Sequence, residues 1–246
     1  MGTSTEGVRY LEKYIFDNEI TYPSNGSFDY SFLNHVFDSI QILDRPDFYS
    51  IVGNTIYIIE HFEIDSTKHN RKGSKQKIEE FKDELRFQQV AGANNDNMSI
   101  YNGQINAEPK IEFYKENLFA AFDDHYNKIE SYKNHVRELV QDFDKYKVVT
   151  IFIIEDSSIF GSLYFKNGLK LLLPVFAREF NSYFKSKQNL DLVLCSSETN
   201  TNTKISWILA RCDIEHMLDK EVSLNDIELV DLRPMSLRAS IFIPKK

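Results

Sequence analysis

Two apolar runs rich in β-branched and aromatic residues, 48–52 and 55–64, flank the dipeptide Gly53-Asn54. Such runs are typical of β-strands, and Gly at the first position of a two-residue loop suits a type II′ turn. The pattern therefore predicts a β-hairpin over 45–65. If Gly53 and Asn54 form the loop, the register sets Asp47 directly across from Glu60.

Helical spacing of apolar residues predicts a helix on each side of this hairpin. One helix spans 4–18, a second runs from Ser27 or Asp29 to Gln41, and a third runs from Ser74 or Lys75 to Val90. The segment 91–109 is rich in Asn and Gly and has little apolar periodicity. We expect it to be a mobile insertion.

Between Leu118 and Tyr146, apolar residues recur at alternating steps of four and three. A heptad stripe of this length predicts one long helix of roughly 50 Å. This helix either folds back on the 75–90 helix and covers the sheet, or projects with it as a helical hairpin. The second arrangement would suit a homodimer. His125 lies on the stripe, where we expect a hydrogen-bonded interior histidine rather than a ligand.

From Lys147 the pattern becomes α/β. Buried strands are predicted at 148–154, 190–195 and 205–211, and a helix over 168–187 is expected to bend at Pro174. Taken together, these helices and strands predict one α/β domain over 1–246. A mixed sheet is flanked by helices, and 74–146 forms a helical insertion.

The composition limits the classes of protein to which this chain can belong. The chain is 42% hydrophobic and 13% aromatic, which suffices for a packed core, and its net charge is −8. That charge disfavours indiscriminate binding to nucleic acid or anionic membranes, so any nucleic-acid contact must use a local basic patch. No apolar run reaches membrane length, and two cysteines build no disulfide framework. With no signal peptide at the start, we expect a cytoplasmic protein without membrane association.

The predicted hairpin brings two carboxylates together. Side chains directly opposed on antiparallel strands have Cβ atoms about 4.5–5.5 Å apart, so Asp47 and Glu60 repel unless a cation or a donor neutralises them. Hard oxygen ligands favour Mg²⁺, Mn²⁺ or Ca²⁺ over zinc, and the carbonyl of His61 could add a further oxygen. The alternative is a pair of solvated carboxylates near a sheet edge.

Pro46-Asp47, the hairpin and Glu60 at the end of its second strand resemble the signature of the PD-(D/E)XK nuclease superfamily. The resemblance implies a restriction-endonuclease-like fold in which Asp47 and Glu60 bind catalytic Mg²⁺. That signature has a lysine two residues after the second acid, where this chain has Phe62. Glu63 and Asp65 are reserve ligands if a β-bulge shifts the register.

The segment after the hairpin carries five cations in ten residues, namely Lys68, Arg71, Lys72, Lys75 and Lys77. Such a run could contact phosphates of nucleic acid, and Lys72 or Lys75 could replace the missing lysine. The alternative is a solvated loop. The sequence thus predicts a Mg²⁺- or Mn²⁺-dependent nuclease or, as the second hypothesis, an inactive nuclease-fold protein that serves as a binding or assembly module.

Overall fold

The computed structural model describes residues 8–11, 15, 20–70, 73–93, 98–103, 106–107, 109–158, 164–165, 173–198, 204–228, 235–236 and 239–244. Chain contacts divide it into two compact units. The first comprises Met1–Ile64, Phe119–Ser157 and Tyr164–Glu228, and the second comprises Asp65–Leu118, Ser158–Leu163 and Leu229–Lys246.

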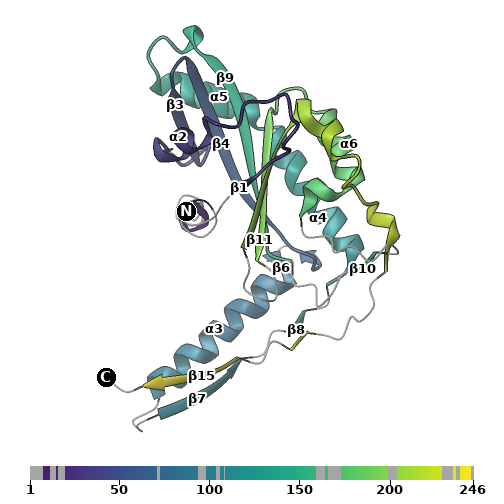
Figure 1. The fold of residues 1–246 in the computed structure, drawn as a ribbon. Coiled ribbons are helices and arrows are strands. Elements are labelled where there is room, and N and C mark those ends of the chain that lie inside the picture. The colour runs from purple at the N-terminus through teal and green to yellow at the C-terminus, as the bar shows by residue number, and fades with distance from the viewer. Residues whose placement is uncertain are drawn as a thin grey trace. The chain divides into compact units, whose positions relative to one another are not determined.

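The first unit is built on a seven-stranded mixed sheet in the order β1-β12-β11-β9-β4-β3-β2 (Figure 1). The α/β prediction with a mixed sheet flanked by helices is confirmed. Strands β4, β9 and β11 are mutually parallel, whereas β2, β3 and β4 form an antiparallel meander. The strands span β1 Ile20–Thr21, β2 Gln41–Ile42, β3 Phe48–Val52, β4 Thr55–Ile64, β9 Lys147–Asp156, β11 Leu192–Glu198 and β12 Lys204–Ala210. A separate pair joins β10 Tyr164–Phe165 to β13 Ile227–Glu228.

The predicted hairpin is present with the predicted register. Val52 pairs with Thr55 and Phe48 pairs with Ile59, so the ladder leads to Asp47 and Glu60. Gly53 has a φ of 59°, whereas Asn54 is not among the residues with positive φ. That sign pattern is the one expected of a type II′ turn with Gly first.

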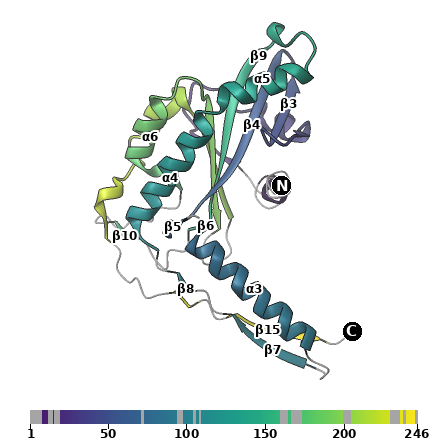
Figure 2. The same ribbon diagram turned by 180° about the vertical axis from the view of Figure 1, so that it is seen from behind.

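Helices cover both faces of this sheet (Figures 1 and 2). One face packs on the described N-terminal helical residues 8–11 and 15 and on α2, Leu33–Asp38, with Ile59, Ile151 and Leu194 in that core. On the other face, Phe122 contacts Phe152 and Phe180 edge to face. The helices on that side are α4 Ile111–Tyr126, α5 Ile129–Leu139 and α6 Arg178–Lys185. Short 3₁₀ helices are η2 Phe143–Lys145, η3 Pro174–Phe176, η4 Arg211–Met217 and η5 Leu224–Asp226.

The helix expected from Ser27 or Asp29 is shorter than predicted, because it begins only at Leu33. The backbone N–H groups of Ser27 and Phe28 and the hydroxyl of Tyr30 all donate to the carboxylate of Asp213. These donors are therefore held in a loop and do not join the helix. The constraint comes from Asp213, which is distant in the sequence.

The prediction of one long helix over 118–146 is wrong. The structure has α4 and α5 with a turn at Asn127 and Lys128 between them, followed by η2. Most of the stripe is nevertheless buried, since Phe122, Ile129 and Val136 are all at most 1% exposed, whereas Leu139 near the end of α5 is 50% exposed. Two short helices can each follow the twisted sheet. The heptad spacing therefore indicated which positions face the core, but not that they belong to one continuous helix. The helical hairpin and the homodimer remain predictions.

The predicted bent helix over 168–187 is also corrected. Residues 168–172 lie outside the described part, and Pro174 opens η3, which is followed by α6 from Arg178. Because proline lacks an N–H and restricts the residue before it, the chain starts a new helix instead of bending one.

The second unit contains α3, Lys75–Ala93, which begins where the sequence predicted it. Ser74 Oγ accepts a hydrogen bond from Lys77 N–H at 3.0 Å, as an N-cap does. Within 91–109, the described residues include β7 and β8, each of which pairs with a distant C-terminal strand. The mobility expected for this segment stays a prediction. The strands of this unit are β5 His69–Asn70, β6 Gly73–Ser74, β7 Met98–Gly103, β8 Asn106–Ala107, β14 Met235–Ser236 and β15 Ala239–Pro244.

No helix in the described part of the chain is long and apolar enough to cross a membrane.

Candidate functional site

The two predicted acids meet at the open end of the hairpin. Asp47 directly precedes β3, and its N–H donates to Glu60 Oε2 at 3.1 Å. The N–H of His61 in turn donates to Asp47 Oδ2 at 2.8 Å. Asp47 is 3% exposed and Glu60 6% exposed. The alternative of two solvated carboxylates is therefore wrong, because both groups are buried and hydrogen-bonded.

Two side chains from the covering helices complete the surroundings of Glu60. Its Oε1 lies 2.8 Å from His125 Nδ1, from α4, and accepts a hydrogen bond from the Tyr132 hydroxyl, from α5, at 2.7 Å. Burial, followed by the charge of Glu60, raises the pKa of Tyr132 above its ordinary value. The tyrosine therefore stays protonated and acts as a donor to the carboxylate.

Phe62 stands where the PD-(D/E)XK signature has a lysine, and it is buried beneath His125. The two rings are stacked, with centroids 4.5 Å apart and planes inclined by 8°. Phe152 meets the same phenyl ring edge to face at 5.6 Å. The space beside Glu60 that the sequence pattern assigns to an ammonium thus holds an aromatic pair.

His61 and Glu63 lie on the opposite face of β4, because successive side chains of a strand alternate. The His61 ring packs on Tyr10 at 4.7 Å, and its Nε2 is 3.4 Å from Glu155 Oε2 without the alignment of a hydrogen bond. Glu63 is in register with Glu155 on β9. The side chains of His61 and Glu63 are therefore not brought together with Asp47 and Glu60. The main chain of His61 does lie beside Asp47, and its carbonyl as a metal ligand stays a prediction.

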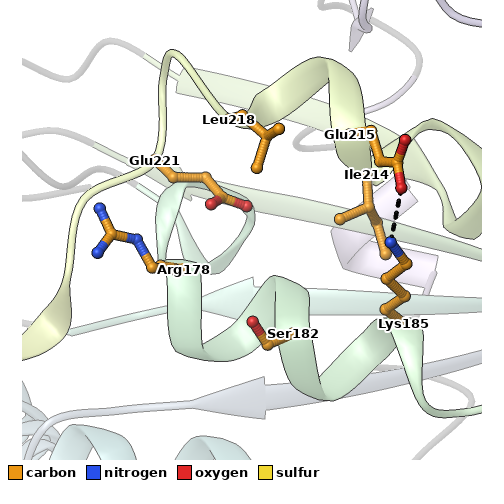
Figure 3. Close-up of a pocket in the computed structure, with 7 residues that line it drawn as sticks. All are labelled: Arg178, Ser182, Lys185, Ile214, Glu215, Leu218 and Glu221. Atoms are coloured by element: carbon orange, nitrogen blue, oxygen red, sulfur yellow. Dashed lines mark hydrogen bonds and ion pairs between the residues drawn. The ribbon is translucent and has the colours of Figure 1, made fainter.

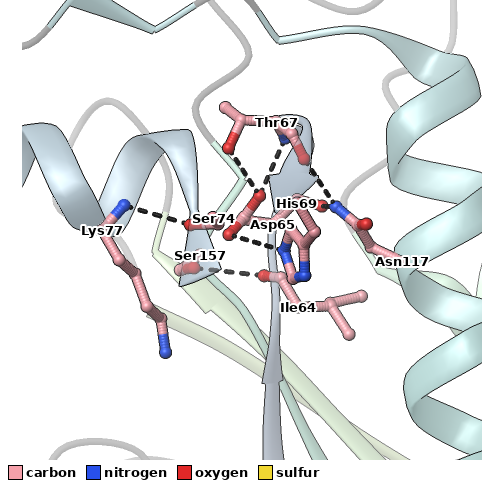
Figure 4. Close-up of polar contacts among 8 residues, drawn as sticks. All are labelled: Ile64, Asp65, Thr67, His69, Ser74, Lys77, Asn117 and Ser157. Atoms are coloured by element: carbon pink, nitrogen blue, oxygen red, sulfur yellow. Dashed lines mark hydrogen bonds and ion pairs between the residues drawn. The ribbon is translucent and has the colours of Figure 1, made fainter. Parts of the chain in front are cut away.

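Asp65 belongs to the second unit and is held within it (Figure 4). Its carboxylate accepts hydrogen bonds from Thr67 N–H at 2.8 Å and Thr67 Oγ1 at 2.9 Å, and His69 Nε2 lies 3.4 Å away. Asn117 Nδ2 donates to the carbonyls of Asp65 and Thr67. This network fixes the exit from β4 and gives Asp65 a local structural role.

The predicted basic patch is described only in part. Lys68, Lys75 and Lys77 are exposed residues of the second unit, whereas Arg71 and Lys72 lie outside the described residues. Their contact with nucleic acid and the replacement of the lysine by Lys72 or Lys75 stay predictions.

His125 and Tyr132 are the residues of this cluster that sequence reasoning did not assign to it. Both lie on the apolar stripe of the predicted long helix, and His125 is hydrogen-bonded as expected. They are 65 and 72 residues from Glu60 in the chain. The sequence signal for both residues was that a side chain with a polar group stands at a stripe position expected to be buried.

The chain matches no protein-family model, no curated protein and no solved structure.

Among the described residues, no group of three or more His, Cys, Asp or Glu side chains is placed to hold a metal ion. Two carboxylates nevertheless suit Mg²⁺, which keeps several waters and is usually bound by one or two carboxylates together with substrate phosphates. Glu60 Oε2 accepts one hydrogen bond, and a carboxylate oxygen can accept two. The pair therefore fits a partly hydrated divalent cation.

A groove of the first unit lies between α6 and η4, away from the acid pair, and has a volume of about 490 Å³ (Figure 3). Arg178 and Lys185 line it together with Glu215 and Glu221, and Lys185 pairs with Glu215 at 2.7 Å. Because its cations and acids balance, the groove favours no charge class of ligand.

Proposed function

We propose that this protein is a metal-dependent nuclease that hydrolyses phosphodiester bonds of nucleic acid, with Asp47 and Glu60 as the ligands of Mg²⁺ or Mn²⁺. The observation that carries the proposal is the contact between these two buried acids across the open end of the hairpin, at 3.1 Å from Asp47 N to Glu60 Oε2. A buried carboxylate pair is costly unless positive charge or donors compensate it. A divalent cation supplies such compensation.

The surrounding architecture supports the same proposal. The acids lie on a hairpin within a mixed sheet that carries helices on both faces, as the resemblance to the restriction-endonuclease-like fold implies. His61 N–H holds Asp47, while His125 and Tyr132 hold Glu60. These donors fix the orientation of both carboxylates before any ligand arrives, which is the arrangement that positions a metal.

A bound divalent cation would activate water and stabilise negative charge that develops on the phosphate. The contribution of the protein is then to hold that ion and to limit the entry of bulk water. The basic residues after the hairpin, Lys68, Arg71, Lys72, Lys75 and Lys77, are proposed to contact the nucleic-acid backbone.

A second candidate function is that of an inactive nuclease-fold protein that acts as a binding or assembly module. The stacked pair of Phe62 and His125 favours it, because an apolar ring fills the position where the family has its lysine. In that case Asp47 and Glu60 serve only to tie the hairpin to the helices above it.

Cleavage of labelled single- and double-stranded DNA and RNA, with Mg²⁺ or Mn²⁺, separates the two functions. We expect cleavage by the unmutated protein and background rates for Asp47→Asn and Glu60→Gln. Glu130→Gln is the matched control, because Glu130 is an exposed acid that pairs with Lys133. Absence of cleavage by the unmutated protein on every substrate, or equal rates for all variants, would leave the binding module as the better account.

A further inference from the structure

The acid cluster of the first unit has one member that is open to solvent. The side chain of His125 is 21% exposed, whereas that of Glu60 is 8% exposed. Nδ1 of the imidazole is directed inward to Glu60, so the open part of the ring lies toward the opposite edge, which carries Nε2. A phosphodiester that reaches the buried acids therefore meets His125 first.

Resting on the proposed function, we propose that His125 is the catalytic residue that stands in for the missing family lysine. The spatial argument is direct, because the imidazole lies flat against Phe62, the residue in the lysine position. His125, from α4, thus lies directly against the β4 side chain at the position where the nuclease signature has its lysine. Neither Lys72 nor Lys75 is needed in this arrangement.

The hydrogen bonds of His125 also fix which nitrogen can react. A carboxylate can only accept, so the contact of 2.8 Å to Glu60 Oε1 places the imidazole proton on Nδ1. In the neutral imidazole that a general base requires, Nε2 is then the nitrogen with a lone pair. A carboxylate that orients an imidazole in this way is a recurrent arrangement for proton transfer.

The step assigned to His125 is general-base activation of the attacking water. Nε2 takes one proton from the water as its oxygen bonds to phosphorus, and the bond from phosphorus to the leaving ester oxygen breaks. The leaving oxygen keeps that electron pair and takes a proton from solvent. The products are a phosphomonoester and an alcohol, and the imidazole returns its proton to solvent.

Three variants test this assignment. His125→Ala removes the ring. His125→Asn, whose amide nitrogen takes the place of Nδ1, keeps an N–H donor for Glu60 but lacks a basic nitrogen. We expect both to lose about 10²–10⁴ in the cleavage rate, the usual contribution of a general base. Both should keep the rise in melting temperature caused by Mn²⁺. His216→Gln, at an exposed histidine of η4, is the matched control and should retain the full rate.

Chemical rescue separates a catalytic role from a structural one. Millimolar imidazole should restore part of the rate of His125→Ala and should leave the unmutated protein unchanged. A fully active His125→Asn variant would reduce His125 to a donor for Glu60 and overturn the assignment, with the proposed function intact. Loss of cleavage in Lys75→Ala but not in His125→Ala would transfer the role to the lysine. An inactive unmutated protein would instead refute the nuclease proposal itself.

Discussion

Two buried carboxylates of the first unit, Glu60 and Asp213, both accept hydrogen bonds on both oxygens, but their donors come from different sources. Asp213 is held by Ser27, Phe28 and Tyr30, which all belong to one loop. Glu60 is held by a strand-end N–H and by two side chains from separate helices, and a second carboxylate lies beside it. The first arrangement closes a loop, whereas the second gathers reactive groups at one point.

The pKa of Asp213 illustrates the structural case. Burial alone would raise it, but the hydrogen bonds from Ser27, Tyr30 and Phe28 outweigh burial and lower the pKa below its ordinary value. The carboxylate is thus fully compensated by neutral donors and leaves no demand for a cation. Glu60 has Asp47 as a neighbour, so of these two carboxylates it is Glu60 that a cation could further stabilise.

The largest expected effect is that of Asp213→Ala. The change removes one acceptor and leaves several buried donors without a partner, which should lower the free energy of unfolding by about 3 kcal/mol or more. Urea denaturation followed by far-UV circular dichroism measures it. A loss below about 0.5 kcal/mol, the range of ordinary surface changes, would show that the loop does not depend on this carboxylate.

Gly26→Ala should have the next largest effect. A Cβ at this position would lie 2.8 Å from Cγ of Asp213, closer than real Cβ atoms come to such neighbours. The crowding should cost about 1–3 kcal/mol, measured by the same denaturation. In the Asp213→Ala background the cost should shrink, because the obstructing carboxylate is gone. Equal costs in both backgrounds would contradict the contact.

A matched pair of tyrosine variants then sharpens the comparison. Tyr132→Phe removes a donor from Glu60, and Tyr30→Phe removes one from Asp213. Each should cost about 1–2 kcal/mol without metal. Millimolar Mn²⁺ should reduce the cost of Tyr132→Phe, because the cation compensates the same carboxylate, and should leave that of Tyr30→Phe unchanged. An identical response of the two variants to Mn²⁺ would remove the distinction between the sites.

The smallest expected effect concerns acid stability. Because folding lowers the pKa of Asp213, its stabilising contribution is complete above the unfolded value of about 3.9 and is lost as pH falls through the lower folded value. Asp213→Asn should therefore flatten the acid limb of stability below about pH 4. Urea midpoints at successive pH values measure the slope, and an unchanged slope would contradict the shift.

A structural feature could be predicted from the sequence where the interactions that create it join residues close together in the chain. The hairpin, its register and the start of α3 follow from local turn and capping chemistry around Gly53 and Ser74, and all three predictions are confirmed. The length of α2 depended on Asp213, and β7 depended on β15, so a local pattern could not reveal either.

The candidate site shows the same division. The proximity of Asp47 and Glu60 came from strand register, which the sequence encodes locally. The contacts of Glu60 with His125 and Tyr132 required the break between α4 and α5, which turns two positions of one stripe toward the same carboxylate. The heptad spacing placed both residues on the buried side but could not place that break.

The most direct test of the proposed metal site is thermal unfolding with and without millimolar Mn²⁺, for the unmutated protein, Asp47→Asn and Asp213→Asn. A cation that binds only the folded state stabilises it by about 2.7 kcal/mol at a hundred times its Kd. We predict a clear rise in melting temperature for the unmutated protein and for Asp213→Asn, and none for Asp47→Asn. An unmutated protein that does not respond to Mn²⁺, or an Asp47→Asn variant that responds equally, would contradict the metal site.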